Sequence, residues 1–395
     1  MRGQDAIDRP GGGLLGIRSN ETRRGAHGPL WAKRGGILMA VSDLTSIWRL
    51  SSGPKGDLTD VSGIRVGHHT LIDEAAGIRT GVTVIAPPAV FPDEEIPAAA
   101  FAYNGTGEMT GFLQVNEWGL LETPIALTGT SGVGATWMGL QMLMIKASPH
   151  VGRDFAPSLP VVGECNDSYL NDSRILSLRP EHVIEAAKGA VSEGVAWGAV
   201  GAGTGMTAFG FKSGIGSASR LVEIDGIRGT VGVAALVNFG QPGDLIVAGI
   251  PVGHLPGETE RTKTPAETPP DGSLIGIIAT DLPLDHHGLM RLARRGPLGM
   301  GRVGGYGRHG SGDLFLALST APREVRGPLV GGPVLSSHHL NDLFLAVVEG
   351  VEEAILDALW RAPSVVGRKG HVSSVLPKTI VLERLRAHGV PLTHS

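Results

Sequence analysis

The chain has 395 residues, of which 42% are apolar, and a formal net charge of −4 at pH 7. This length and composition predict a large soluble protein with a sizeable core, and the slightly acidic charge offers no basic surface for nucleic acid. A single cysteine, Cys165, excludes an intramolecular disulfide and a zinc site built from several cysteines. The 60 glycines show no collagen period and indicate many short strands joined by tight turns.

Residues 1–55 are the least fold-like part of the chain. They are polar and rich in glycine and arginine, which is typical of a flexible N-terminal extension. Their apolar run, residues 37–41, is too short for a secretory signal or a membrane span. We therefore expect no targeting segment and no membrane partner, and we predict a cytoplasmic protein.

From residue 58 onward, short apolar segments alternate with glycine-rich turns. Residues 63–67, 80–86 and 230–236 predict strands, and residues 130–146 predict a helix with an apolar face. Periodicity alone therefore indicates an α/β or α+β fold with many short strands.

Neither of two polar clusters has the spacing of a metal site. The acidic group around Glu164 lacks the EF-hand pattern and favours a hydrogen-bonded turn network. His286 and His287 are adjacent, so they point in different directions on a helix and offer no second ligand. We expect neither a metal nor a cofactor.

A carboxylate and an indole stand four residues apart, just before a run of small residues. Glu193 and Trp197 could give an ammonium group a charge partner and a cation–π contact. The alternative is a glutamate on a helix surface and a tryptophan packed in the core.

The predicted strand at residues 230–236 leads to Asn238, just before Phe239 and Gly240. An Asn amide at the end of a buried strand can donate to a developing oxyanion, and loss of such a donor typically costs ~3–4 kcal/mol of barrier. Asn238 is therefore a catalytic candidate. The alternative is an asparagine that forms a turn before glycine.

A glycine-rich segment, residues 296–307, runs into Gly310 and Ser311 and then into an apolar strand, residues 314–318. So many glycines predict a loop that holds no stable helix. Because glycine leaves its carbonyl carbon unhindered, the Ser311 hydroxyl could cut the Gly310–Ser311 bond. Ser311 would then own an α-amine with a pKa near ~8, so that nucleophile and general base share one residue. The alternative is a glycine-rich hairpin loop before a core strand.

Residues 341–360 predict a long helix with an apolar stripe. Glu352 borders this stripe, and Glu353 faces further out. Residues 366–395 resemble a C-terminal appendage on the surface.

The segment around Ser311 resembles the processing site of the DmpA-type family, which comprises L-aminopeptidase D-Ala-esterase/amidases and β-peptidyl aminopeptidases. Six further segments resemble this family in the same order along the chain: residues 60–68, 162–172, 200–206, 211–216, 237–240 and 280–284. One such motif would be weak, but six in register are a strong indication.

The resemblance implies a four-layer αββα sandwich, similar to the N-terminal nucleophile (Ntn) hydrolases but with different connectivity. Its domain would span residues 56–365, with an α part ending at Gly310 and a β part beginning at Ser311. The implied activity is release of N-terminal residues from short peptides, amides or esters by a self-cleaved serine enzyme. The resemblance also implies a homo-oligomer, a tetramer.

The resemblance assigns a residue that orients the new α-amine. In the family this is a glutamate of a Glu-Glu pair, which corresponds to Glu352 here, with Glu353 as the alternative. A hydroxyl residue stands two positions earlier in the family, but Gly350 and Val351 have no side-chain oxygen. Water or Ser319 would have to replace it, or the pair is simply solvated.

The resemblance also places a Glu and a Trp four residues apart in the substrate pocket, and these correspond to Glu193 and Trp197. Two rival functions fit the same sequence. One is an autoprocessing acyltransferase of similar layered fold, and the other is a non-enzymatic glycine-rich ligand-binding protein whose chain stays uncut.

Overall fold

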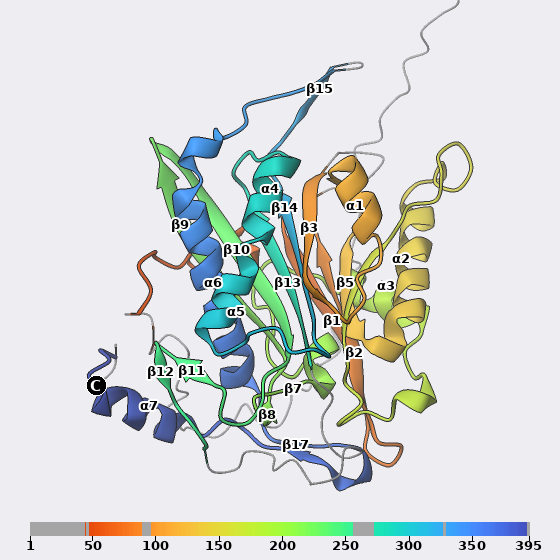
Figure 1. Ribbon diagram of the computed structural model, residues 1–395. Coiled ribbons are helices and arrows are strands. Elements are labelled where there is room, and N and C mark those ends of the chain that lie inside the picture. The colour runs from red at the N-terminus through yellow and green to blue at the C-terminus, as the bar shows by residue number, and fades with distance from the viewer. Residues whose placement is uncertain (1–43, 45–46, 89–95, 256–271, 327–328, 393–395) are drawn as a thin grey trace, which may run out of the picture.

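Two β-sheets stand face to face at the centre of the protein, and helices cover the outer face of each (Figure 1). The computed structural model describes residue 44 and residues 47–88, 96–255, 272–326 and 329–392. Most of the predicted N-terminal extension therefore lies outside the described residues.

The larger sheet has six strands in the order β4-β3-β14-β13-β10-β9. Neighbouring strands are antiparallel, except that β13 and β14 run parallel. Every residue of β13 and β14 is buried, and their largely apolar sequences follow from cover on both faces. The bounds are β3 Ile96–Gly105, β4 Leu120–Leu121, β9 Ile215–Ile224, β10 Ile227–Asn238, β13 Ser273–Thr280 and β14 Gly312–Ser319.

The smaller sheet has four strands in the order β1-β2-β5-β6, of which β5 and β6 are parallel. Its bounds are β1 Arg65–Asp73, β2 Ile78–Ala86, β5 Ile125–Gly129 and β6 Val161–Cys165. Short ladders lie outside both sheets: β7 Thr207–Ala208 with β8 Phe211–Lys212, β11 Ile246–Val247 with β12 Ile250–Pro251, β15 Glu324–Arg326 with β16 Leu329–Gly331, and β17 Val365–Val366 with β18 Val372–Ser373.

Three buried apolar clusters fill the spaces between neighbouring layers. The first joins Leu127 and Val161 of the smaller sheet to Ile275 and Leu316 of the larger sheet. The second lies between the larger sheet and α4, α5 and α6, and the third lies between the smaller sheet and α2 and α3. The predicted layered αββα fold is thus confirmed. Helix bounds are α1 Phe112–Trp118, α2 Val133–Ala147, α3 Pro180–Lys188, α4 His286–Ala293, α5 Gly296–Arg302, α6 Asn341–Arg361 and α7 Lys378–Ala387.

The glycine-rich segment before Ser311 begins with helix α5, so the prediction that it holds no helix was wrong. A Cβ on Gly299 would lie 2.6 Å from the carbonyl oxygen of Val348 in α6. A Cβ on Gly296 would lie 2.2 Å from the ring of Phe315 in β14. Glycine lowers helix propensity, but here it permits close packing, and tertiary contacts stabilise the helix.

Both ends of the described chain pack in the outer layer beside α6. Leu44 and Trp48 belong to the same buried cluster as α6, and α7 adds Val381 and Leu385 to it. The segment expected as a C-terminal appendage therefore contributes to the core. Within the described ranges, no helix has the length and apolar character needed to cross a lipid bilayer.

Candidate active site

Ser311 directly precedes β14, which runs through the larger sheet between β3 and β13. The residue is only 2% exposed. The chain turns tightly before it, since the Ser311 N–H donates to the Arg308 carbonyl at 2.9 Å. The Gly310–Ser311 bond therefore lies at the end of the larger sheet, where the glycine-rich loop joins β14.

The end of β3 holds this turn with three hydrogen bonds. Asn104 Nδ2 donates to the Arg308 carbonyl at 2.6 Å, and the Thr106 hydroxyl donates to the His309 carbonyl at 3.2 Å. The Thr106 N–H donates to the Ser311 carbonyl at 3.2 Å. None of these bonds engages the Gly310 carbonyl, which is the group that Ser311 would attack.

The residue after the serine must be glycine for steric reasons. A Cβ on Gly312 would lie 2.6 Å from the Cα of Gly107 and 2.6 Å from the Thr106 carbonyl oxygen. Real Cβ atoms do not approach backbone so closely, so any side chain would push the turn away from β3. The glycine of this motif therefore serves close packing.

Asp313 is the acidic group that the structure places on the serine hydroxyl. The Ser311 hydroxyl donates to Asp313 Oδ1 at 2.8 Å, and both residues are buried. Burial raises the pKa of Asp313 to about 6, against smaller lowering effects from hydrogen bonds with Ser311, Leu274 and Asn104. This role of Asp313 was not predicted from the sequence, although alternation along a strand puts residues two apart on one face.

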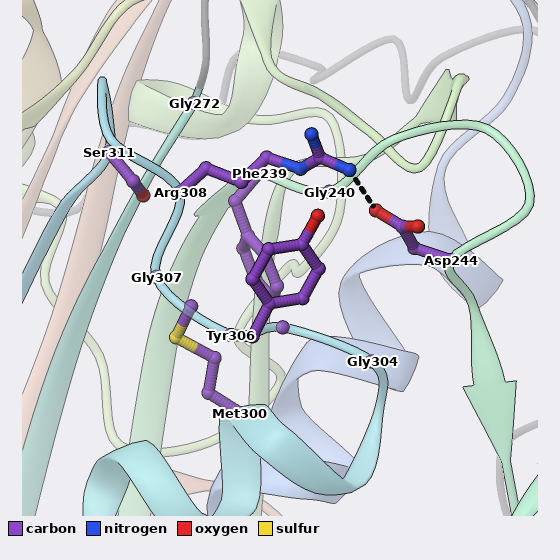
Figure 2. A pocket seen from close by; sticks show the side chains of 11 residues that line it. Phe239, Gly240, Asp244, Gly272, Met300, Gly304, Tyr306, Gly307, Arg308 and Ser311 are labelled. Carbon is purple, nitrogen blue, oxygen red and sulfur yellow. Dashed lines mark hydrogen bonds and ion pairs between the residues drawn. The ribbon is translucent and has the colours of Figure 1, made fainter.

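A small pocket lies beside Ser311 (Figure 2). Its wall includes an ion pair of 2.8 Å between Arg308 and Asp244, and the Arg308 guanidinium lies 4.9 Å from the ring centre of Tyr306. The remaining lining residues are apolar or glycine: Phe239, Gly240, Gly272, Met300, Gly304, Gly305 and Gly307. The pocket thus offers a mainly uncharged surface next to the hydroxyl.

Asn238 lies at the same end of the larger sheet as Ser311. It pairs with Ser273 across β10 and β13, and the Ser273 hydroxyl accepts from the Gly312 N–H at 3.3 Å. The Asn238 amide donates to the Asn166 carbonyl at 2.9 Å and its oxygen accepts from a backbone N–H at 3.0 Å. Its role as an oxyanion donor stays a prediction.

The two glutamates of α6 have other partners. Glu352 accepts from Trp48 Nε1 at 3.0 Å and pairs with Arg302 at 3.1 Å, and Glu353 pairs with buried Arg220. Burial raises the pKa of Glu352 and raises that of Glu353 to about 7, with Arg302 and Arg220 respectively opposing the shift. Among the described residues, these contacts do not reach the serine, so the assignment of either glutamate stays a prediction.

Ser319 is too distant to replace the missing family hydroxyl. It ends β14, whereas Ser311 precedes that strand, so the two are roughly 26 Å apart at the usual rise per strand residue. Its hydroxyl donates to the Leu282 carbonyl at 2.7 Å. The alternative that named Ser319 was therefore wrong.

Glu193 and Trp197 do not line the pocket beside Ser311. Glu193 is exposed, and Trp197 is buried between the sheets, where its Nε1 donates to Asp57 at 3.2 Å. Their role in substrate binding stays a prediction.

Glu164 is a buried carboxylate close to the serine turn. Its Oε1 accepts from the Glu108 N–H at 3.0 Å and lies 3.4 Å from a Cβ placed on Gly107, the glycine that touches Gly312. The Thr130 hydroxyl donates to its other oxygen, and burial raises its pKa. The sequence signal was a glutamate inside the apolar run of β6, which was interpreted as part of a turn.

The sequence matches known peptidases over most of its length. Residues 56–373 match peptidase family S58. The β-peptidyl aminopeptidase BapA of Sphingosinicella microcystinivorans is 40% identical over 348 residues, which make up 82% of this chain and 86% of that protein.

Solved structures share the fold. The PH0078 protein from Pyrococcus horikoshii OT3 has a TM-score of 0.81 at 41% identity, over 89% of this chain and 99% of that chain. The L-aminopeptidase D-Ala-esterase/amidase of Ochrobactrum anthropi, described as a variant of the Ntn hydrolase fold, has a TM-score of 0.79 at 33% identity, over 87% and 97% of the two chains. The prediction of an Ntn-like aminopeptidase fold is confirmed. The chain belongs to peptidase family S58, as its resemblance to the DmpA-type enzymes predicts.

Proposed function

We propose that this chain is a self-cleaving N-terminal-serine aminopeptidase that releases N-terminal residues from short peptides, amides or esters. The observation that carries the proposal is the placement of Ser311. Its buried hydroxyl follows a turn held by β3 and lies 2.8 Å from a carboxylate. Similarity to a β-peptidyl aminopeptidase and to an L-aminopeptidase supports the reaction type.

Cleavage of the Gly310–Ser311 bond leaves two chains that remain associated. The Ser311 hydroxyl then attacks the carbonyl of the substrate's N-terminal residue, and the new α-amine, with an ordinary pKa of ~8, accepts the proton. The amine returns this proton to the leaving group, and water hydrolyses the acyl-enzyme. Asn238 and backbone N–H groups stabilise the oxyanion. This cycle requires neither metal nor cofactor.

Two carboxylates, Glu164 and Glu193, are alternative candidates for binding the ammonium group of the substrate. Glu164 lies beside the serine turn, and none of its partners among the described residues is a cation. Glu193 is exposed and does not line the pocket beside Ser311. If Glu164 binds the ammonium, Glu164→Gln raises KM at least tenfold and Glu193→Gln leaves it unchanged; the reverse result would favour Glu193 and Trp197.

The deciding experiment measures intact mass and N-terminal sequence of the purified protein. We expect a fragment that begins at Ser311, and we expect Ser311→Ala to abolish both this cut and the hydrolysis of alanine p-nitroanilide. Ser319→Ala, at the far end of the same strand, is the control and should be cut and active. A wild-type chain that stays intact, or activity in Ser311→Ala, would contradict the proposal.

The assembly and the compartment are also part of the proposal. The family resemblance supports a homotetramer, and the sequence favours the cytoplasm. Sedimentation equilibrium of the cleaved protein tests the first, and cell fractionation tests the second. Adding an amine acceptor to the assay separates hydrolysis from acyl transfer, the rival activity.

A further inference from the structure

Self-cleavage poses a proton-transfer problem that substrate turnover does not. Under the proposed function, the α-amine of Ser311 is the base during turnover. In the uncut chain this nitrogen is a peptide N–H, which donates to Arg308 and has no basic lone pair. The first attack of the hydroxyl therefore needs a different proton acceptor.

Asp313 is already bonded to the hydroxyl in the uncut chain. Ser311 and Asp313 are 2% and 0% exposed, and the donor–acceptor distance of 2.8 Å is that of a normal O–H···O bond. The second oxygen, Oδ2, is buried and has no hydrogen-bond partner among the described residues. A carboxylate so placed retains the capacity to take up a proton.

Among the described residues, none of the groups that shift the pKa of Asp313 is a cation. The β3 neighbour is the Asn104 amide, and β13 contributes the Leu274 N–H. In the smaller sheet, the buried thiol of Cys165 is close enough to both Asp313 and Glu164 for their carboxylates to raise its pKa, after the larger effect of burial. Burial without a cation raises the pKa of Asp313 to about 6, which makes it a stronger base than an exposed aspartate while it remains ionised at neutral pH.

We propose that the carboxylate of Asp313 is the general base for self-cleavage of this chain. As the Ser311 Oγ bonds to the Gly310 carbonyl carbon, its proton passes to Asp313. The C–N bond then breaks, and Asp313 returns the proton to the departing α-amine. The product is an ester between Gly310 and the Ser311 oxygen. Water hydrolyses this ester to the Gly310 carboxylate and the free hydroxyl, so that Asp313 ends unchanged.

The test follows cleavage of the full-length chain, made by cell-free translation and transferred to buffers from pH 5 to pH 8. We expect wild-type cleavage to slow below pH ~6, about tenfold per unit. Asp313→Asn keeps the size of the side chain but cannot accept the proton, and its cleavage should be at least about 100-fold slower, without the inflection. Asp357→Asn, a buried aspartate of α6, is the matched control and should follow the wild type.

The outcomes separate this proposal from the proposed function. If the wild type is cut and Asp313→Asn is cut equally fast, or more slowly with the inflection retained, the general-base role is overturned while the aminopeptidase stands. If the melting temperature of Asp313→Asn shows that this variant fails to fold, the pH profile of wild-type cleavage tests the role of Asp313 instead. A wild-type cleavage rate that does not change between pH 5 and pH 8 would overturn that role. A wild-type chain that is never cut overturns both proposals.

Discussion

Two buried polar clusters of this molecule differ in the partners that they give to their carboxylates. In the outer layer, fully buried Arg220 pairs with Glu349 at 3.2 Å and with Glu353, and its guanidinium lies 4.9 Å from the Trp48 ring centre. At the end of the larger sheet, Asp313 is equally buried, but the groups that lower its pKa are all neutral: the Ser311 hydroxyl, the Leu274 N–H and the Asn104 amide. The outer cluster gives its carboxylates a cationic partner, whereas Asp313 has neutral partners.

The difference shows that a carboxylate whose oxygens all accept hydrogen bonds holds the structure together, whereas one with an unbonded oxygen can take part in proton transfer. Besides Arg220, the oxygens of Glu349 accept the backbone N–H groups of Arg49 at 2.9 Å and Leu50 at 3.2 Å. Glu349 therefore fixes the N-terminal segment onto α6. Asp313 keeps one oxygen unbonded among the described residues. The following variants test this contrast, and their stabilities are measured in a Ser311→Ala background so that the chain stays whole.

Removing the cation of the outer cluster should have the largest effect. Arg220→Met leaves Glu349 and Glu353 buried without a counter-charge, and we expect the free energy of unfolding to fall by about 3–5 kcal/mol. Urea denaturation measures it. Arg228→Met is the control, because its pair with Glu223 is exposed at 81% and 55%, and it should lose less than about 1 kcal/mol. Similar losses in both would show that the Arg220 cluster is not a structural centre.

A side chain at Gly312 should damage the serine cluster. Because its Cβ would clash with backbone of Gly107, Gly312→Ala should lower the free energy of unfolding by about 1–3 kcal/mol, and with Ser311 restored it should slow self-cleavage. Gly105→Ala is matched, since no atom lies within 4 Å of its Cβ position. Equal stability of the two variants would contradict the close packing of this turn.

The unpaired carboxylate should cost stability at neutral pH. Burial raises the pKa of Asp313 from 3.8 to about 6, so the folded state disfavours the charged form, and the Ser311→Ala background removes a hydrogen bond that opposes this shift. The cost is absent below pH ~4, grows up to pH ~6 and is complete above it. Asp313→Asn should therefore raise the free energy of unfolding by about 1–3 kcal/mol at pH 8 and leave it nearly unchanged at pH 4. A gain that is equal at both pH values would rule out this titration.

The smallest effect concerns the indole of the outer cluster. Trp48→Phe removes the donor that reaches Glu352 at 3.0 Å, and we expect a loss of about 1–2 kcal/mol in thermal or urea unfolding. Trp118→Phe serves for comparison because Trp118 is 58% exposed, and it should change little. If the two losses agree, the bond from Trp48 contributes nothing measurable.

Several elements were predictable because their signals are local. The long helix at residues 341–360 and the strands at residues 80–86 and 230–236 follow from apolar periodicity, and the structure contains α6, β2 and β10 there. Helix α5 was not predictable, since its glycines gain stability only from contact with α6 and β14. Helix propensity describes the preference of each residue by itself and takes no account of contacts with distant parts of the chain.

The sequence by itself determined the family and the strand-entry serine, because the motif around Ser311 and its glycines are contiguous in the chain. Tertiary structure alone decided which groups each acid meets. Trp48 and Glu352 are 304 residues apart in sequence yet form a hydrogen bond. Asn104 reaches the carbonyl of Arg308 across 204 residues. Burial and pairing set the charge of an acid, and both depend on neighbours that only folding brings together.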